Sequence, residues 1–334
     1  MVLLLDVLQV DALNDHGWVF GLQVGIDTKS TNLSDFFIFL SQGSGDRPKP
    51  GFHDTARIMK ITDAQIHAWY PNTPQRPWVE GASPPHGPQF TIEQVLATMD
   101  GCGVERCIIV PVMCTGFDND FALEGARAHP DRLAVMGRFD ITAADAPQRL
   151  ANWRDPKGML GVRIFFMGEP WMSLLTEQRY AWFWADMERL RMPLMCTVPG
   201  HMKALHPIMD RHPELRIIID HSGRHPRGPK DEAAWADLDQ TLHLAKYKNT
   251  SIKVSSLPSF SSKPYPFPSL HKPIREIYDH FGPQRMLWGS DVTRLDWGYA
   301  DNLRLFTEAL EFLSANDREW ILSRAAAKHC DWPL

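Results

Sequence analysis

Short apolar segments alternate with helix-like segments from about residue 59 to the end of the chain. A helix is predicted to begin at Thr91, which has capping-box spacing to Gln94 and precedes apolar positions at helical spacing. Further helices are predicted over 177–191, about 300–313 and 317–328. The apolar segments read as eight strands, over 61–67, 107–112, 133–138, 160–166, 193–198, 216–220, 251–254 and 286–289.

Eight strands that alternate with helices predict a single (β/α)8 barrel, also called a TIM barrel. Strands that are short and almost wholly apolar are typical of a parallel sheet buried on both faces. An open, doubly wound sheet is the alternative. No GxGxxG motif follows the first strand and the chain has no P-loop, which excludes the two common nucleotide sites and favours the barrel.

Residues 1–58 lack this alternation of apolar and helix-like segments. They contain a short apolar run at 36–40, followed by a stretch rich in Gly, Pro and Ser. We interpret 1–58 as an N-terminal extension of unclear order that supplies none of the eight strands, and 59–334 as the barrel domain.

Composition narrows the classes of protein. Hydrophobic residues make up 44% and charged residues 22%, an ordinary globular balance, and the net charge of -5 disfavours a nucleic-acid partner. Five cysteines without a CxxC pair argue against a disulfide framework, so we expect reduced thiols in a cytoplasmic protein. No apolar run approaches the ~20 residues that span a bilayer, so no membrane partner is expected. A small-molecule substrate is the expected partner.

Polar residues stand at the carboxyl ends of the predicted strands, where the active site of a TIM barrel lies. Any one of them could be purely structural. The joint placement of His67, His221 and Asp291 after strands one, six and eight indicates one shared site. The other polar residues at these ends are Gln65, Arg138, Arg163, Asp220, Lys253, Ser255, Thr293 and Arg294.

Four motifs carry a resemblance to a known family. They are ITDAQIH at 61–67, GVR at 161–163, IDHSG at 219–223 and FGPQRMLWGSD at 281–291. With these motifs the chain resembles the amidohydrolase-related family, often called amidohydrolase 2, over residues 59–334. The resemblance implies a distorted TIM barrel. It also implies chemistry, because family members are metal-dependent hydrolases and decarboxylases, or lactonases that use no metal.

The chain departs from the family's metal-binding pattern. Metal-binding members use two histidines in an HxH motif after strand one, a histidine after strand five and an aspartate after strand eight. Here Gln65 replaces the first histidine, and strand five ends without one, since His201 is expected to open the next helix. His67, His221 and Asp291 would remain as ligands, and three protein ligands suffice for a catalytic zinc. We favour no metal, with zinc or manganese as the alternative.

The resemblance to pyrone dicarboxylate lactonases implies roles for the residues. Asp291 would be the general base that removes a proton from water. His67 and His221, with Gln65, would donate hydrogen bonds to the carbonyl oxygen as negative charge develops there. Arg163 would pair with a substrate carboxylate. The secondary substrate-binding candidates are Arg138 and Lys253.

The expected function is therefore hydrolysis of a lactone or ester of a small, aromatic-derived carboxylic acid. The alternative is a divalent-metal hydrolase or a non-oxidative decarboxylase of an aromatic acid at the same site. A barrel that only binds is disfavoured, because His221 and Asp291 both remain. Aromatic residues of the segment 257–268, namely Phe260, Tyr265 and Phe267, could wall a flat substrate or belong to a surface crossing stiffened by proline. The family resemblance also implies a homodimer.

Overall fold

The computed structural model describes residues 10–13, 19–24, 38–39 and 59–334, except for 170, 226, 296 and 297. The chain divides into two units, Met1–Arg57 and Ile58–Leu334. In the first unit, β1 (Val10–Leu13), β2 (Val19–Val24) and β3 (Ile38–Phe39) form a small antiparallel sheet.

Protein that begins at Met59 is expected to keep the barrel fold. The strands of the first unit pair within their own three-stranded sheet, and the eight-stranded sheet is built wholly from the second unit. Circular dichroism and thermal melting of the shortened chain, compared with the full chain, test this expectation. Insoluble or unfolded shortened protein would show that residues 1–58 cover apolar surface that the barrel needs.

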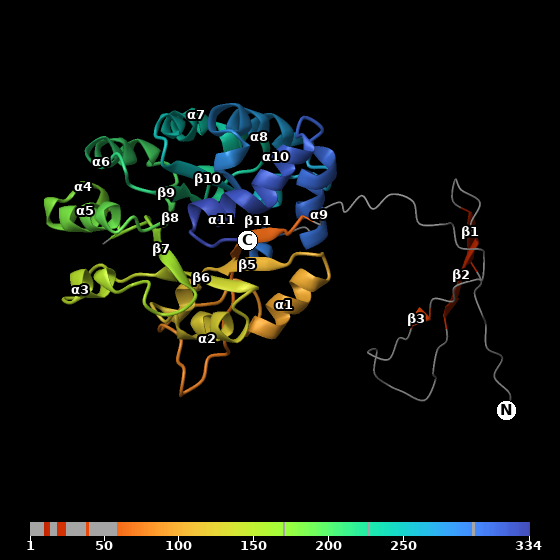
Figure 1. Ribbon diagram of the computed structural model, residues 1–334, viewed down its shortest axis with the longest axis horizontal. Helices are drawn as coiled ribbons and strands as arrows, with labels where there is room; N and C mark the ends of the chain where they lie inside the picture. Colours follow the sequence, from red (N-terminus) through yellow and green to blue (C-terminus); the bar gives the residue numbers. More distant parts are fainter. Residues whose placement is uncertain are drawn as a thin grey trace. The chain divides into compact units, whose positions relative to one another are not determined.

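The second unit is the predicted TIM barrel (Figure 1). Its eight strands are parallel and lie side by side in the order of the sequence. Between the first and last strands, the amide of Asp291 donates to the carbonyl oxygen of Gln65 at 2.8 Å, which nearly closes the barrel. The strands are β4 (Thr62–Ile66), β5 (Arg106–Ile109), β6 (Leu133–Arg138), β7 (Met159–Phe165), β8 (Leu194–Thr197), β9 (Ile217–Ile219), β10 (Thr250–Ser255) and β11 (Met286–Gly289).

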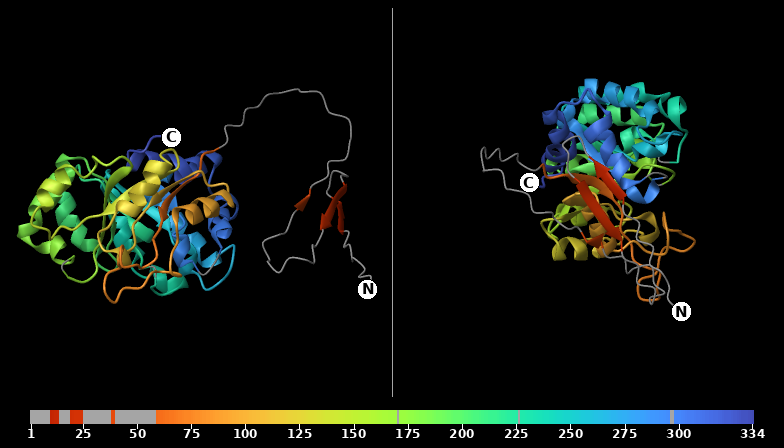
Figure 2. Two further views of the ribbon diagram at one scale, coloured as in Figure 1. Left: turned by 90° about the horizontal axis from the view of Figure 1, so that it is seen from below. Right: turned by 90° about the vertical axis from the view of Figure 1, so that its right-hand side faces the viewer.

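Helices surround the sheet, as Figures 1 and 2 show. The capping box of Thr91 and Gln94 opens the first of them, as predicted. The predicted helix over 300–313 ends in a wider π-helical turn, Leu305–Ala309, and the predicted helix over 317–328 is interrupted by another, Trp320–Arg324. The α-helices are α1 (Ile92–Asp100), α2 (Asp120–Ala128), α3 (Ala146–Ala151), α4 (Ser173–Thr176), α5 (Ala181–Arg189), α6 (His206–Arg211), α7 (Leu238–Leu242), α8 (Pro268–Phe281), α9 (Tyr299–Arg304), α10 (Ala315–Glu319) and α11 (Ala325–His329). None of the described helices is long and apolar enough to cross a membrane.

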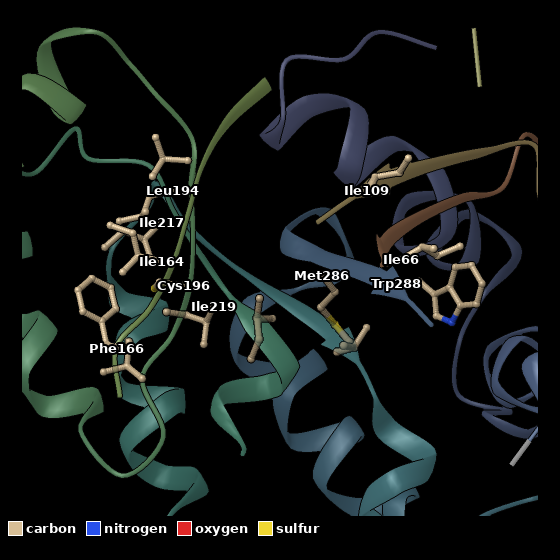
Figure 3. Close-up of a cluster of buried hydrophobic side chains, with 14 of the residues drawn as sticks. Ile66, Ile109, Ile164, Phe166, Leu194, Cys196, Ile217, Ile219, Met286 and Trp288 are labelled. Carbon is tan, nitrogen blue, oxygen red and sulfur yellow. The ribbon is translucent and has the colours of Figure 1, made fainter. Parts of the chain in front are cut away.

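Alternation along the strands sorts the core into an outer and an inner layer. Ile217 and Ile219 of β9 belong to the outer layer between sheet and helices (Figure 3), whereas Ile218 between them faces the barrel interior. Ala326 and Cys330 add α11 and the residue after it to this inner layer. The inner layer also contains Ala64, Ile108, Val110, Ala134, Met136, Leu160, Met195, Leu287 and Ala325.

Two strands bring polar side chains into this interior. In β10, Ile252 and Val254 face outward, so Lys253 and Ser255 face inward, where both are fully buried. In β4, the pairing with β5 shifts register between Asp63 and Ile66. A shift of this kind changes which side chains point to which face. Gln65 of β4 lies on the same side as Lys253, which donates to it, and His67 just after β4 lies next to the amide of Gln65.

Candidate active site

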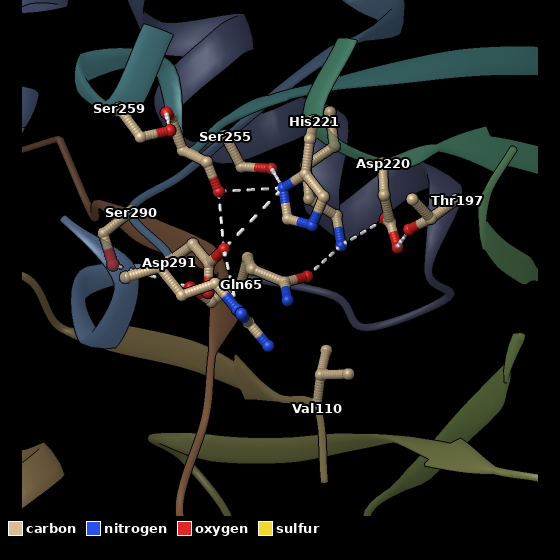
Figure 4. A network of polar contacts seen from close by, with 12 residues as sticks. Gln65, Val110, Thr197, Asp220, His221, Ser255, Ser259, Ser290 and Asp291 are labelled. Carbon is tan, nitrogen blue, oxygen red and sulfur yellow. Dashed lines mark hydrogen bonds and ion pairs between the residues drawn. The ribbon is translucent and has the colours of Figure 1, made fainter. Parts of the chain in front are cut away.

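The polar residues at the carboxyl ends of the strands form one buried network (Figure 4). It joins His67, His221 and Asp291, which the sequence places after three different strands. Its other members are Gln65, Arg163, Thr197, Asp220, Lys253, Ser255 and Ser256.

Asp291 and His67 form the first half of the network. Nδ1 of His67 lies 2.6 Å from the carbonyl oxygen of Val110, so it carries a hydrogen and donates. Nε2 of His67 lies 3.1 Å from Oδ1 of Asp291. Burial by itself would raise the pKa of Asp291, but its interactions with His67 and, more weakly, His221 hold it well below the usual range. Asp291 is therefore a carboxylate that only accepts hydrogen bonds.

His221 lies between this carboxylate and the end of β10. Its Nδ1 is 2.9 Å from Oγ of Ser255 and 3.0 Å from Oγ of Ser256, and Ser256 also donates to Oδ2 of Asp291 at 2.5 Å. Burial lowers the pKa of His221 to about 4, so its imidazole is neutral at neutral pH.

The backbone at this corner is unusual. His221, Ser256 and Asp291 have φ angles of 51°, 56° and 53°, in the left-handed region that non-glycine residues rarely adopt. Such conformations cost about 1–3 kcal/mol each and persist where the surrounding structure holds them. They turn the chain sharply just after β9, β10 and β11, which aims all three side chains at one another.

Lys253 organises the second half of the network. Its fully buried ammonium lies 2.8 Å from Oδ1 of Asp220 and donates to Oε1 of Gln65 at 2.7 Å. Nε of Arg163 lies 3.2 Å from the other oxygen of Asp220. Burial would raise the pKa of Asp220, but Lys253 and Arg163 outweigh it and lower this pKa to about 2. Gln65 links the two halves, because its amide nitrogen lies 3.2 Å from Nε2 of His67.

A cavity of about 350 Å³ opens above the network. Of the predicted site residues, His67, His221 and Arg163 line it, with Phe165 as an aromatic wall. Arg294 also lines it, and so do His225 and Arg227, which sequence reasoning missed. His225 and Arg227 follow the IDHSG motif, and this position just after strand six is the sequence signal that could have identified them as cavity residues.

Other predicted residues lie behind the cavity wall. Gln65, Lys253 and Asp291 are fully buried and are not among the described residues that line the cavity. Arg138 donates to the carbonyl oxygen of Val112 at 3.0 Å, and burial lowers its pKa to about 10. Gln65, Lys253 and Asp291 can act on a substrate in the cavity only through the side chains in front of them.

The aromatic segment 257–268 does not wall the cavity. Phe260 and Phe267 are buried in the outer core, and the hydroxyl of Tyr265 donates to Glu308 on the outside of the barrel. Of the two alternatives left open by the sequence, the substrate wall is not found, and the segment instead packs the rings of Phe260 and Phe267 into the outer core next to α8.

Most of the candidate metal donors face other partners in this structure. Oε1 of Gln65 is bonded to the ammonium of Lys253, and both nitrogens of His67 face other partners. Nδ1 of His221 faces two serine hydroxyls. Within the part of the chain that the structure describes, no three His, Cys, Asp or Glu residues are grouped to hold a cation. His201, as expected, starts the short helical turn Met202–Leu205 and is exposed.

The family model for amidohydrolases matches residues 62–329, which spans the barrel from its first strand to its last helix. The chain belongs to the amidohydrolase family. This amidohydrolase is 29% identical over 258 residues to the L-fucono-1,5-lactonase of Burkholderia ambifaria, covering 72% of this chain and 83% of the relative. It is 25% identical over 253 residues to the 4-sulfomuconolactone hydrolase of Rhizobium radiobacter, covering 73% and 78% of the two chains.

Solved structures share the fold of this amidohydrolase. One is an amidohydrolase of Burkholderia multivorans with bound zinc, with a TM-score of 0.69, 21% identity and coverage of 82% of this chain and 100% of that one. Another is a probable 2-pyrone-4,6-dicarboxylic acid hydrolase of Acinetobacter baumannii with citric acid bound, with a TM-score of 0.68, 19% identity and the same coverage. Zinc is therefore found on this fold.

Proposed function

We propose that this amidohydrolase hydrolyses the lactone, or an activated ester, of a small carboxylic acid. The observation that carries the proposal is a buried, ionised Asp291 joined to His67 and His221, both of which line the cavity. Water adds to the carbonyl carbon and loses a proton to a base, which makes the ring oxygen a leaving group. The two curated relatives, which are named as a lactonase and a lactone hydrolase, support this reaction class.

The charge of the cavity supports an acidic substrate. Arg163, Arg227 and Arg294 line it, and none of its described lining residues is a carboxylate. The nearest carboxylate behind Arg163 is Asp220, which Lys253 already neutralises. A carboxylate on the substrate would meet a planar guanidinium that can bond it through two hydrogens. Phe165 offers a face for a flat ring.

A panel of acidic lactones, aryl esters and aromatic acids tests the function, assayed with and without a chelator. We expect lactone hydrolysis whose rate a chelator leaves intact, and well under one equivalent of metal in the purified protein. Strained or aryl-activated esters react without a Lewis acid, and Gln65 stands where metal-binding family members have a histidine.

Two outcomes contradict this proposal. Stoichiometric zinc or manganese whose removal abolishes activity and whose return restores it would replace it with a metal-dependent hydrolase. Release of carbon dioxide from an aromatic acid, with no lactone turned over, would replace it with a decarboxylase.

Arg163→Met should weaken substrate binding more than catalysis. A hydrogen bond to a charged group is worth ~1.5–3 kcal/mol, so KM should rise by about 10–100-fold with a smaller change in kcat. Steady-state kinetics on an acidic lactone measure both constants. Arg179→Met is the control, because Arg179 is exposed and pairs with Glu177. A neutral lactone that shows the same rise in KM would mean that Arg163 does not bind a carboxylate.

Two further properties belong to the proposal. All five cysteines are free, four of them buried, which supports a cytoplasmic location.

A homodimer, implied by the family resemblance, stays a prediction that size-exclusion chromatography with light scattering can test.

A further inference from the structure

The carboxylate on which the proposed function depends does not itself face the cavity. Asp291 is fully buried, and its two oxygens already face Nε2 of His67 and Oγ of Ser256. Water in the cavity can therefore reach this negative charge only through a side chain that lines the wall. Three lining side chains approach Asp291, namely His67, His221 and Arg294. A guanidinium stays protonated and cannot take a proton from water, which leaves His67 and His221 as the candidates.

His67 has no free lone pair for a water molecule. Its Nδ1 donates to the carbonyl oxygen of Val110, and its Nε2 faces both the ionised Asp291 and the amide nitrogen of Gln65, so both nitrogens already have partners. His221 differs. Its Nδ1 faces the serine hydroxyls, and its Nε2 has no hydrogen-bond partner within the described residues of the barrel.

The hydrogens around His221 can be assigned from the chemistry of its neighbours. An ionised carboxylate accepts hydrogen bonds and cannot donate, so Ser256 must donate its single hydrogen to Asp291. Oγ of Ser256 then offers only lone pairs to His221, 3.0 Å away. An unprotonated Nδ1 would face those lone pairs, which repel it. Oγ of Ser255, 2.9 Å from Nδ1, can accept as well as donate, so a hydrogen on Nδ1 satisfies both serines, whereas an unprotonated Nδ1 would conflict with Ser256. This favours the hydrogen on Nδ1, with the lone pair of the neutral ring on Nε2.

We propose that Ser256 is a positioning residue that couples Asp291 to His221, and that Nε2 of His221 is the base that meets water. This inference rests on the proposed lactone hydrolysis. The water oxygen bonds to the carbonyl carbon as its proton moves to Nε2, and the carbonyl π pair moves onto oxygen. When that pair returns, the bond between carbon and ring oxygen breaks, and the ring oxygen takes the proton from Nε2. Lactone and water thus give a hydroxy acid.

The geometry suits this task. When Nε2 takes a proton, the imidazolium lies 3.9 Å from Oδ2 of Asp291, measured from Nδ1, with the Ser256 hydroxyl between them. The charge is stabilised in a site that excludes solvent, since all three side chains are almost fully buried. Figure 4 shows the contacts that converge between His221, Ser255 and Asp291. Ser255 also lies near Nδ1, but among the described residues it is Ser256 whose hydroxyl contacts both Nδ1 and the carboxylate.

Two variants and one spectrum test the proposed coupling of Asp291 to His221 through Ser256. Ser256→Ala removes the hydroxyl, and Ser256→Gly removes it at a left-handed position that glycine adopts without strain. Both should lower kcat by ~10–100-fold with KM changed less than about threefold. In ¹⁵N-histidine NMR of the wild type, with His221→Asn to assign the signals, His221 should be the Nδ1–H tautomer, and Ser256→Ala should shift it toward Nε2–H.

A double variant and a control complete the design. Ser256→Ala combined with Asp291→Asn should be no slower than Asp291→Asn alone, because the two residues act as one unit. Ser261→Ala should keep the wild-type rate, since this buried serine of the same segment donates only to the carbonyl oxygen of Lys263.

The proposed coupling through Ser256 is contradicted if His221 is the Nε2–H tautomer in the wild type, or if both Ser256 variants keep kcat within twofold. The tautomer reading is independent of whether the reaction class is right. A wild-type protein that turns over no lactone would contradict the proposed function. The NMR measurement needs no substrate, so it would still decide the tautomer.

Discussion

Asp291→Asn should lower kcat by about 10²–10⁴-fold on the true substrate and leave KM nearly unchanged. The asparagine keeps the size of the side chain but removes the negative charge that both His67 and Ser256 face. Whether the carboxylate takes the proton itself or acts through His221, the developing positive charge loses its partner. Arg163 and the apolar wall of the cavity still hold the substrate, which is why KM should change little.

Stopped assays on the best lactone of the panel, together with thermal melting, separate catalysis from folding. Asp279→Asn is the matched control, because Asp279 is a half-exposed aspartate on α8 that pairs with Arg275. Near-wild-type turnover in Asp291→Asn would end the assignment of this carboxylate. Loss of activity together with loss of the cooperative melt would show that Asp291 is needed for the fold instead.

Lys253→Met should lower the free energy of unfolding by about 3–5 kcal/mol, the usual cost of removing one partner of a buried ion pair. Methionine has a similar length but no charge and no donor. The change would leave Asp220 with Arg163 as its single cationic partner, and Oε1 of Gln65 without its ammonium donor. Both groups are fully buried, so water cannot replace the lost contacts.

Urea unfolding of the variant measures this loss. The control is Lys272→Met, because Lys272 is 88% exposed on α8 and such substitutions usually stay within about 0.5 kcal/mol. A loss below about 1 kcal/mol in Lys253→Met would mean that the network tolerates an uncompensated charge.

Sequence alone predicted the fold because alternation and strand composition are local signals. Every expected strand is present, and Ile217 to Ile219 show why: three isoleucines in a row fit only a strand that packs on both faces. The meeting of His67, His221 and Asp291 could also be predicted, since the carboxyl ends of parallel strands gather at one mouth.

The inward polar residues could not be sorted by sequence into those that face the cavity and those behind its wall. Lys253 follows the same alternation as a cavity residue would, yet its long side chain turns toward Asp220 within the barrel. Ser256 was missed because its position depends on a left-handed backbone. A Ser-Ser pair does not indicate a left-handed conformation, whereas a glycine would.

Because His221, Ser256 and Asp291 adopt a left-handed backbone, catalytic activity and thermal stability make opposite demands on these three positions. Glycine, or asparagine, relaxes each of these turns, and each such exchange also discards a group that the chemistry needs. Laboratory evolution that selects this enzyme for heat resistance alone would therefore tend to collect changes at these three positions and return robust, inactive barrels. Selection for turnover must accompany it from the first round.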